Sequence, residues 1–206
     1  HQQRHLCSEK LFYNLKLLAM KNLISYLQSI HPLSTALQDH LSIVLKTKEL
    51  TRKEYLLKQG RISKEICFIE KGLLRCFYLK DDKEVCSWFM KECDVIISVE
   101  SFFIQQSSKE SIQALEDCIL YYITYDELQH IYKTFPEFNF IGRVLTEKYY
   151  TLSEQRLYSI RMQRSFERYD FLMEKHPELI QRVPSKYLAS YLGITEETLS
   201  RIRSKV

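Results

Sequence analysis

The chain has 206 residues, of which 45% are hydrophobic, and 14 Tyr and 11 Phe are among them. This composition excludes disordered, collagen-like and fibrous coiled-coil proteins, and the 4 glycines leave little material for the glycine-rich loops of nucleotide-hydrolysing folds. The net charge of +4 arises in the last third, because residues 1–142 hold 18 basic and 18 acidic residues whereas residues 143–206 hold 12 and 8.

The amino-terminal part carries no targeting signal. No apolar run approaches the ~18 residues of a membrane span, and the first apolar stretch lacks the small-residue cleavage site of a signal peptide. We therefore expect a cytoplasmic protein without a membrane partner. Met20 is interpreted as the natural start, with residues 1–19 as an upstream extension.

The middle of the chain changes from a helical to a strand pattern. Apolar residues recur at helical intervals over residues 23–45, and Pro32 divides this stretch into two short helices. Residues 48–124 then hold short β-branched and aromatic runs separated by turn residues, which predict a sandwich or barrel. The expected strands are 54–60, 66–72, 73–79, 84–89, 112–115 and 119–123.

A long helix is predicted after Pro136, followed by another over residues 163–175. The long helix has an apolar stripe at intervals of three and four residues: Ile141, Leu145, Tyr149 and Leu152. Such a stripe suits a helix packed on its own barrel and equally a seam between two copies. The dimer seam is the prediction taken forward, and the other alternative stays open.

The last stretch, residues 184–206, has the features of a helix-turn-helix. We expect Ser185 to cap the first helix, Gly193 to form the turn and Thr195 to cap the second helix. Small or apolar residues at inward-facing positions complete the pattern: Leu188, Ala189, Leu192, Leu199 and Ile202.

The second of these helices presents polar residues near its start: Glu197, Thr198, Ser200, Arg201 and Ser204. This is the part of a recognition helix that contacts base edges. Arg201 can bind guanine through two hydrogen bonds and Glu197 can accept one from cytosine, so the two side chains can read neighbouring G·C pairs. The alternative is a surface ion pair between them. Four arginines precede this unit, as phosphate contacts or as ordinary surface charge: Arg156, Arg161, Arg164 and Arg168.

Two stretches resemble the Crp/Fnr family of bacterial transcription regulators, and the resemblance covers nearly the whole chain from about residue 34. The first stretch is Lys53 to Gly60 followed by Ile66 to Arg75, with a Q-G turn and an I-x-x-G-x-x-R turn. The second is Glu197-Thr198-Leu199-Ser200-Arg201, which is similar to the E-T-x-S-R pattern of the Fnr branch.

The resemblance implies an α+β fold in four parts. An amino-terminal extension and helix (1–33) would precede a cyclic-nucleotide-binding-like β-roll of the jelly-roll type (34–135). A long dimerisation helix (136–160) and an all-α winged-helix or helix-turn-helix domain (161–206) would follow.

The same resemblance implies a homodimer on a palindromic operator, with the helix over residues 195–205 in the major groove of double-stranded DNA. Base reading would fall to Glu197, Ser200 and Arg201, and phosphate contacts to Ser185, Lys186 and Thr198, with Thr195 at the helix start. RNA polymerase is a further candidate partner.

The effector site departs from the family pattern. Cyclic-AMP binders hold the ribose with Gly-Glu and the phosphate with Arg-Ser-Ala, but residues 99–114 contain neither the glycine nor the arginine. Lys109 can supply a point charge, although Glu110 beside it repels an anion. We expect no tight binding of cyclic AMP, and Glu100 and Lys109 are the candidate residues for some other effector.

No metal or cofactor is predicted, because the cysteine spacings match no zinc site and only Cys7 lies near the amino terminus, where an iron–sulfur sensor needs several. The other cysteines are expected to be buried and reduced. No catalytic arrangement stands out, so we expect a regulator and not an enzyme. The alternative function is a ligand-binding sensor whose helix-turn-helix contacts protein instead of DNA.

Overall fold

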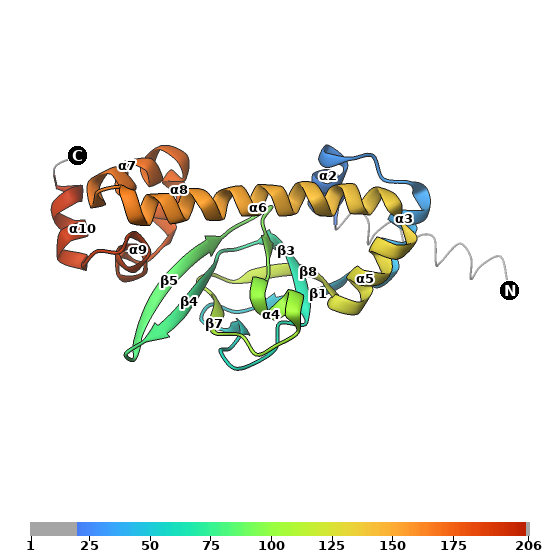
Figure 1. Cartoon of the computed structure of the whole chain (residues 1–206), viewed down its shortest axis with the longest axis horizontal. Helices are drawn as coiled ribbons and strands as arrows, with labels where there is room; N and C mark the ends of the chain where they lie inside the picture. Colours follow the sequence, from blue (N-terminus) through green and yellow to red (C-terminus); the bar gives the residue numbers. More distant parts are fainter. Residues whose placement is uncertain (1–19, 205–206) are drawn as a thin grey trace, which may run out of the picture.

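The computed structural model describes residues 20–204, and the predicted extension over residues 1–19, including Cys7, lies outside them. One long helix runs along the molecule, with a β-roll beneath it and shorter helices at both of its ends (Figure 1). No helix in the described part is both long and apolar enough to cross a membrane. The α+β fold class is confirmed.

The β-roll consists of two four-stranded sheets whose neighbouring strands are antiparallel, with orders β1-β8-β3-β6 and β2-β7-β4-β5. Its strands are β1 (Lys46–Leu50), β2 (Tyr55–Leu57), β3 (Glu65–Lys71), β4 (Leu74–Lys80), β5 (Lys83–Met90), β6 (Val95–Ile96), β7 (Glu110–Ala114) and β8 (Cys118–Thr124). The six predicted strands match six of these, whereas β1, β6 and the helix α4 (Val99–Ile104) were not predicted.

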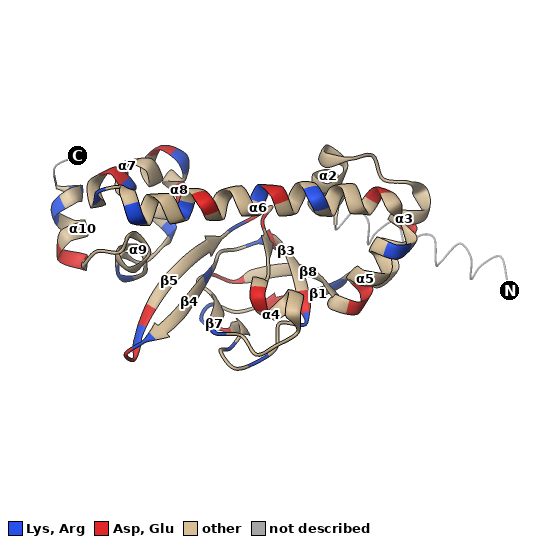
Figure 2. Cartoon of the chain, viewed as in Figure 1, with Lys and Arg blue, Asp and Glu red and all other residues tan. Residues whose placement is uncertain are grey.

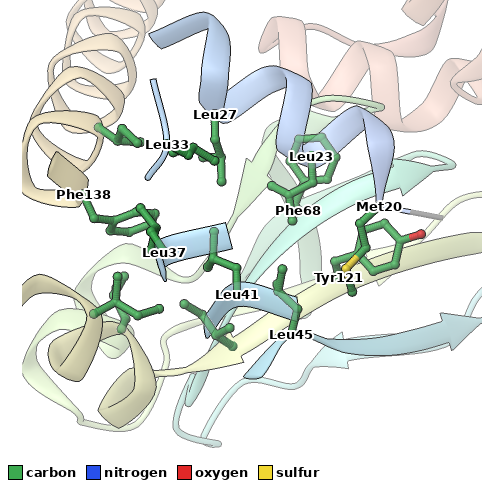
Figure 3. Packing of buried hydrophobic residues seen from close by; sticks show 14 of the residues in the cluster. Met20, Leu23, Leu27, Leu33, Leu37, Leu41, Leu45, Phe68, Tyr121 and Phe138 are labelled. Carbon is green, nitrogen blue, oxygen red and sulfur yellow. The ribbon is translucent and has the colours of Figure 1, made fainter. Parts of the chain in front are cut away.

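The amino-terminal helices α2 (Lys21–Ile30) and α3 (Thr35–Val44) are separated at Pro32 as predicted. Ser34 caps α3, because its Oγ accepts a hydrogen bond from the Leu37 N–H at 3.2 Å. Figure 3 shows the core that these helices form with the roll, and its labelled side chains come from α2 and α3 with the residues that flank them, from β3 and β8, and from the long helix. This core joins the helices, the roll and the start of the long helix into one body.

The apolar stripe of the long helix α6 (Pro136–Met162) packs for most of its length against its own chain. Ile141 is fully buried within its own chain, and Leu145 packs against the same core. The Tyr149 hydroxyl accepts a hydrogen bond from the Val95 N–H at 2.7 Å. The stripe from Ile141 to Tyr149 therefore packs on its own roll, which is the alternative that the sequence left open beside a dimer seam. Periodicity identifies an apolar face and not what covers it. Leu152, the last residue of the stripe, is half-buried.

The carboxy-terminal part is all-helical, as predicted. It contains α7 (Ser165–Lys175), α8 (Pro177–Arg182), α9 (Ser185–Leu192) and α10 (Glu196–Arg203), and α5 (Tyr125–Thr134) precedes α6. Between residues 136 and 204 the structure has helices and no strand.

Candidate DNA-reading surface and ligand cavity

Helices α9 and α10 form the helix-turn-helix through local backbone chemistry. Gly193 ends α9 in the left-handed region, with φ of 67°, which a glycine adopts without steric cost. Thr195 caps α10, since its side chain accepts the Thr198 N–H at 3.2 Å. The prediction that Ser185 caps α9 is wrong, because Pro184 occupies the cap position. The Ser185 hydroxyl instead accepts a hydrogen bond from Arg203 at 3.0 Å.

One face of α10 is buried and the other is open to solvent. Leu199 is buried in the core beneath α10, whereas Glu197, Ser200 and Arg201 are exposed and Thr198 is half-buried. Ser185, Lys186 and Thr195 are exposed as well, so the structure brings the seven predicted DNA-binding residues to the surface of α9 and α10.

The predicted alternative, an ion pair between Glu197 and Arg201, is not among the ion pairs of residues 20–204. Arg201 instead donates one hydrogen bond to the Thr198 hydroxyl at 3.3 Å. The hydrogen bond from the Thr195 side chain holds the pKa of Glu197 below its usual range, so this carboxylate is charged at neutral pH. Figure 2 shows acidic residues at one end of α10 and basic residues further along it.

The four predicted arginines divide into two kinds. Arg156 lies 3.6 Å from the centre of the Tyr191 ring and donates to the Tyr191 carbonyl, and Arg168 donates to the Leu192 carbonyl at 2.9 Å. These two arginines therefore satisfy the last carbonyls of α9. Arg161 and Arg164 are exposed.

Helix α9 also packs against strand β5 of the roll. The Ser190 hydroxyl accepts the Cys86 N–H at 2.9 Å and donates to the Glu84 carbonyl at 3.1 Å. The guanidinium carbon of Arg75 lies 3.7 Å from the centre of the Tyr187 ring. The helix-turn-helix formed by α9 and α10, called the reading unit below, is thus attached to the ribbon formed by β4 and β5.

Arg75 is the centre of this contact and is only 1% exposed. It donates to Gln113 Oε1 at 3.0 and 2.6 Å and forms an ion pair with Glu84 at 2.7 Å. The hydrogen bond from Arg75 lowers the pKa of Glu84. Each charge buried here has a partner, as stable burial of charge requires.

A second polar contact joins α8 to the roll. Arg182 forms paired hydrogen bonds with Glu92 at 2.9 and 2.9 Å and with Glu116 at 2.9 and 2.6 Å. Burial acts to raise the pKa of Glu92, but hydrogen bonds from Arg182 and from the Gly72 N–H outweigh it and lower the pKa to about 2. The forked geometry makes this a strong and directional contact.

A cavity of about 560 Å³ lies on the opposite side of the β4–β5 ribbon, between the roll, α4 and α6. Both predicted effector residues line it, but they bind each other: Lys109 Nζ lies 2.8 and 3.0 Å from the two carboxylate oxygens of Glu100. The two side chains are 72% and 60% exposed, so they stand at the mouth of the cavity.

The polar residues inside the cavity were not predicted as site residues. Glu110 faces Tyr78 across the β4–β7 pairing, and both residues line the cavity together with Ser98. Burial raises the pKa of Glu110, and burial together with Glu110 raises the pKa of Tyr78 to about 12. Side chains alternate between the two faces of a strand, but the sequence alone does not show which face lines the cavity. That requires the register of the strands.

Among residues 20–204, no group of three or more His, Cys, Asp or Glu side chains is placed to hold a metal ion. Four of the described cysteines are buried and Cys93 is exposed.

Comparison with known proteins agrees with this architecture. Residues 47–135 match the family model of the cyclic nucleotide-binding domain. A protein from Eubacterium rectale that is described as a Crp/Fnr-family transcriptional regulator aligns with a TM-score of 0.63 and 20% identity, over 82% of this chain and 82% of that one. The chain has the Crp/Fnr fold.

Two other solved structures share the Crp/Fnr fold with this chain. FixK2 from Bradyrhizobium japonicum aligns with a TM-score of 0.67 and 18% identity over 79% of this chain and 84% of its own. The c-di-GMP-responsive global regulator CLP from Xanthomonas campestris aligns with a TM-score of 0.65 and 16% identity over 81% of this chain and 88% of its own. The search of curated proteins gave no match. The resemblance seen in the sequence is confirmed.

Proposed function

We propose that the chain is a sequence-specific DNA-binding transcription regulator that places α10 in the major groove. The observation that carries the proposal is the division of α10 into a buried face at Leu199 and an open face with Glu197, Ser200 and Arg201. A rigid helix that projects such side chains from its first turns can reach base edges. Two proteins of the same fold that are described as regulators, CLP and the protein from Eubacterium rectale, support the class of function.

The arginines support the same assignment. Arg75, Arg156 and Arg168 are engaged within the chain, whereas Arg201 is exposed and makes one long hydrogen bond to Thr198. A guanidinium group has five N–H donors, so Arg201 keeps most of its capacity for a guanine. The modest charge excess favours binding through base contacts over bulk electrostatic attraction.

The regulator is proposed to act as a homodimer on a palindromic operator. Near its carboxy-terminal end α6 exposes Tyr158 and Met162, with exposed fractions of 62% and 69%. Large apolar side chains exposed on one helix suit contact with the same helix of a second copy. RNA polymerase would be a further partner if the regulator activates transcription.

Selection from a random DNA library with the full chain tests the proposal. We expect enrichment of a palindromic sequence, and we expect Arg201→Ala to weaken binding to it by about tenfold or more, since a bidentate base contact contributes about 1–3 kcal/mol. Arg143→Ala is the matched control, because Arg143 is an exposed α6 residue whose ion-pair partner is Glu147. Absence of any enriched sequence at low salt would contradict the proposal.

The alternative of a sensor that uses its helix-turn-helix for protein contacts has one observation in its favour. Helix α9 already makes such contacts, through Ser190 and Tyr187, with the roll of its own chain. These contacts leave the open face of α10 unused, so DNA reading remains the better-supported function.

A further inference from the structure

The wall of the cavity contains an irregularity in β5 that bears on what the cavity holds. Cys86 pairs with Phe77 and Trp88 pairs with Cys76, so Ser87 is an extra residue between two adjacent pairs. This is a β-bulge, and bulges redirect side chains next to binding sites.

The bulge determines which side chains face the cavity. Cys86 and Phe89 both pack with the helix-turn-helix, although they are three residues apart and an uninterrupted strand would place them on opposite faces. Trp88 and Met90 instead face the interior of the roll, and Ser87 lines the cavity with them.

The Ser87 hydroxyl is buried and has no hydrogen-bond partner within residues 20–204. A buried hydroxyl without a partner destabilises the fold, whereas a polar atom of a bound molecule would satisfy it. The Ser87 hydroxyl is therefore a candidate hydrogen-bonding partner for one polar group of a molecule in the cavity.

The charges of the wall exclude an anion. Lys109 is the one cation among the described lining residues, and both oxygens of Glu100 already bind it at the mouth. Glu110 lies inside, so a phosphate or carboxylate there would have a carboxyl group beside it and no free cation.

The remaining wall is apolar and rich in rings. Its aromatic side chains are Tyr78, Trp88, Phe103, Tyr132, Tyr149 and Tyr150. The volume of about 560 Å³ is that of a small-molecule site, and rings of this density favour a planar partner that packs edge-to-face or offset against them.

We propose that the cavity binds an uncharged aromatic molecule whose hydroxyl or amino group hydrogen-bonds to Ser87 Oγ. Such a molecule would be the effector of the regulator proposed above, and in that role the inference rests on the proposed function. Binding in the cavity does not depend on DNA, so the test of the ligand and the test of DNA reading can fail separately.

The single tryptophan of the chain makes the test direct. Because Trp88 lines the cavity, full-length protein labelled with fluorotryptophan gives one fluorine NMR resonance from its wall. We expect 2-naphthol, which is uncharged at neutral pH, to shift this resonance saturably with a sub-millimolar Kd. We expect 2-naphthoate, cyclic AMP and the saturated alcohol decahydro-2-naphthol to bind at least fivefold more weakly.

Ser87→Ala tests the hydrogen bond. We expect it to weaken 2-naphthol about three- to tenfold, as for the loss of one hydrogen bond, and to leave naphthalene binding unchanged. Ser29→Ala is the control, since the Ser29 hydroxyl is exposed on α2 and bonds the Tyr26 carbonyl. Equal or tighter binding of either anion or of the saturated alcohol, no binding of 2-naphthol, or an unchanged affinity in Ser87→Ala would overturn the proposal.

Discussion

The two faces of the β4–β5 ribbon use polar groups in opposite ways. On the face toward α9, Arg75 and Glu84 are paired with each other and held by Gln113 and Tyr187. On the face toward the cavity, the wall is apolar and the Ser87 hydroxyl lacks a partner within the described chain. The polar groups of the first face are paired within the chain, whereas the Ser87 hydroxyl on the second face is not. One ribbon thus holds α9 on one face and, under the proposal above, offers a ligand site on the other.

The largest loss of stability is expected from Arg75→Ala, which removes the central residue of the contact between the ribbon and α9. The substitution leaves Gln113 and Glu84 without their donor and removes the group beneath the Tyr187 ring. Because Arg75 is buried but Glu84 is partly exposed, we expect the free energy of unfolding to fall by about 3 kcal/mol, measured by urea denaturation. An unchanged denaturation midpoint would show that this contact does not hold α9. Arg75→Lys keeps the positive charge but not the forked guanidinium group, so its free energy of unfolding should lie between those of Arg75→Ala and the unsubstituted protein.

Arg182→Ala removes the second polar contact between the helices and the roll. The group is partly exposed, as are Glu92 and Glu116, so solvent screens the pairs. We expect a loss of about 1–2 kcal/mol in the free energy of unfolding, by thermal or urea denaturation. Lys175→Ala, at an exposed pair with Glu174, is the control and should change stability little. A loss equal to that control would contradict the assigned role.

Acid should weaken the same contact between Arg182 and Glu92. The pKa of Glu92 is lowered from 4.5 to about 2, so its contribution to stability is complete above about pH 4.5 and is lost as the pH falls toward 2. We expect the dependence of the denaturation midpoint on pH in this window to be reduced in Glu92→Gln. Glu174→Gln, which changes an exposed carboxylate, should leave the slope as it is in the unsubstituted protein.

The smallest effects come from two serines on opposite faces of the ribbon. Ser190→Ala removes the hydroxyl that bonds the Cys86 N–H and the Glu84 carbonyl, and we expect it to cost about 1 kcal/mol. Ser87→Ala removes a buried hydroxyl without a partner and should leave stability unchanged or slightly higher. Denaturation of both variants under one condition measures the difference, and a larger loss in Ser87→Ala would reverse the comparison.

Features set by local chemistry were predictable from the sequence. Gly193 and Thr195 mark the turn and the cap of α10 because a left-handed residue and a capping hydroxyl act on their immediate neighbours. Pro32 separates α2 from α3 for the same reason. The family resemblance, carried by two short motifs, gave the order of the roll, the long helix and the reading unit.

Features set by distant contacts were not predictable. The stripe at Ile141 indicated an apolar face, but only the structure shows that the roll of the same chain covers it. The sequence indicated Arg75 only as part of a turn motif. Its contact with Tyr187 joins residues that are far apart in the sequence, so no local pattern predicted it. The polar atoms of the cavity depend on strand register and on the bulge at Ser87, which no local pattern reveals.

Strand β5 lies at the outer edge of its sheet, since the order is β2-β7-β4-β5. An exposed edge offers unpaired N–H and C=O groups to strands of other molecules and is a site of aggregation. Ser190 occupies two of these groups, and α9 packs along the strand. Helix α9 therefore also covers this edge, and complete detachment of α9 would expose it to other molecules. Under the proposed function, we therefore expect a ligand to act through movements small enough to keep that edge covered.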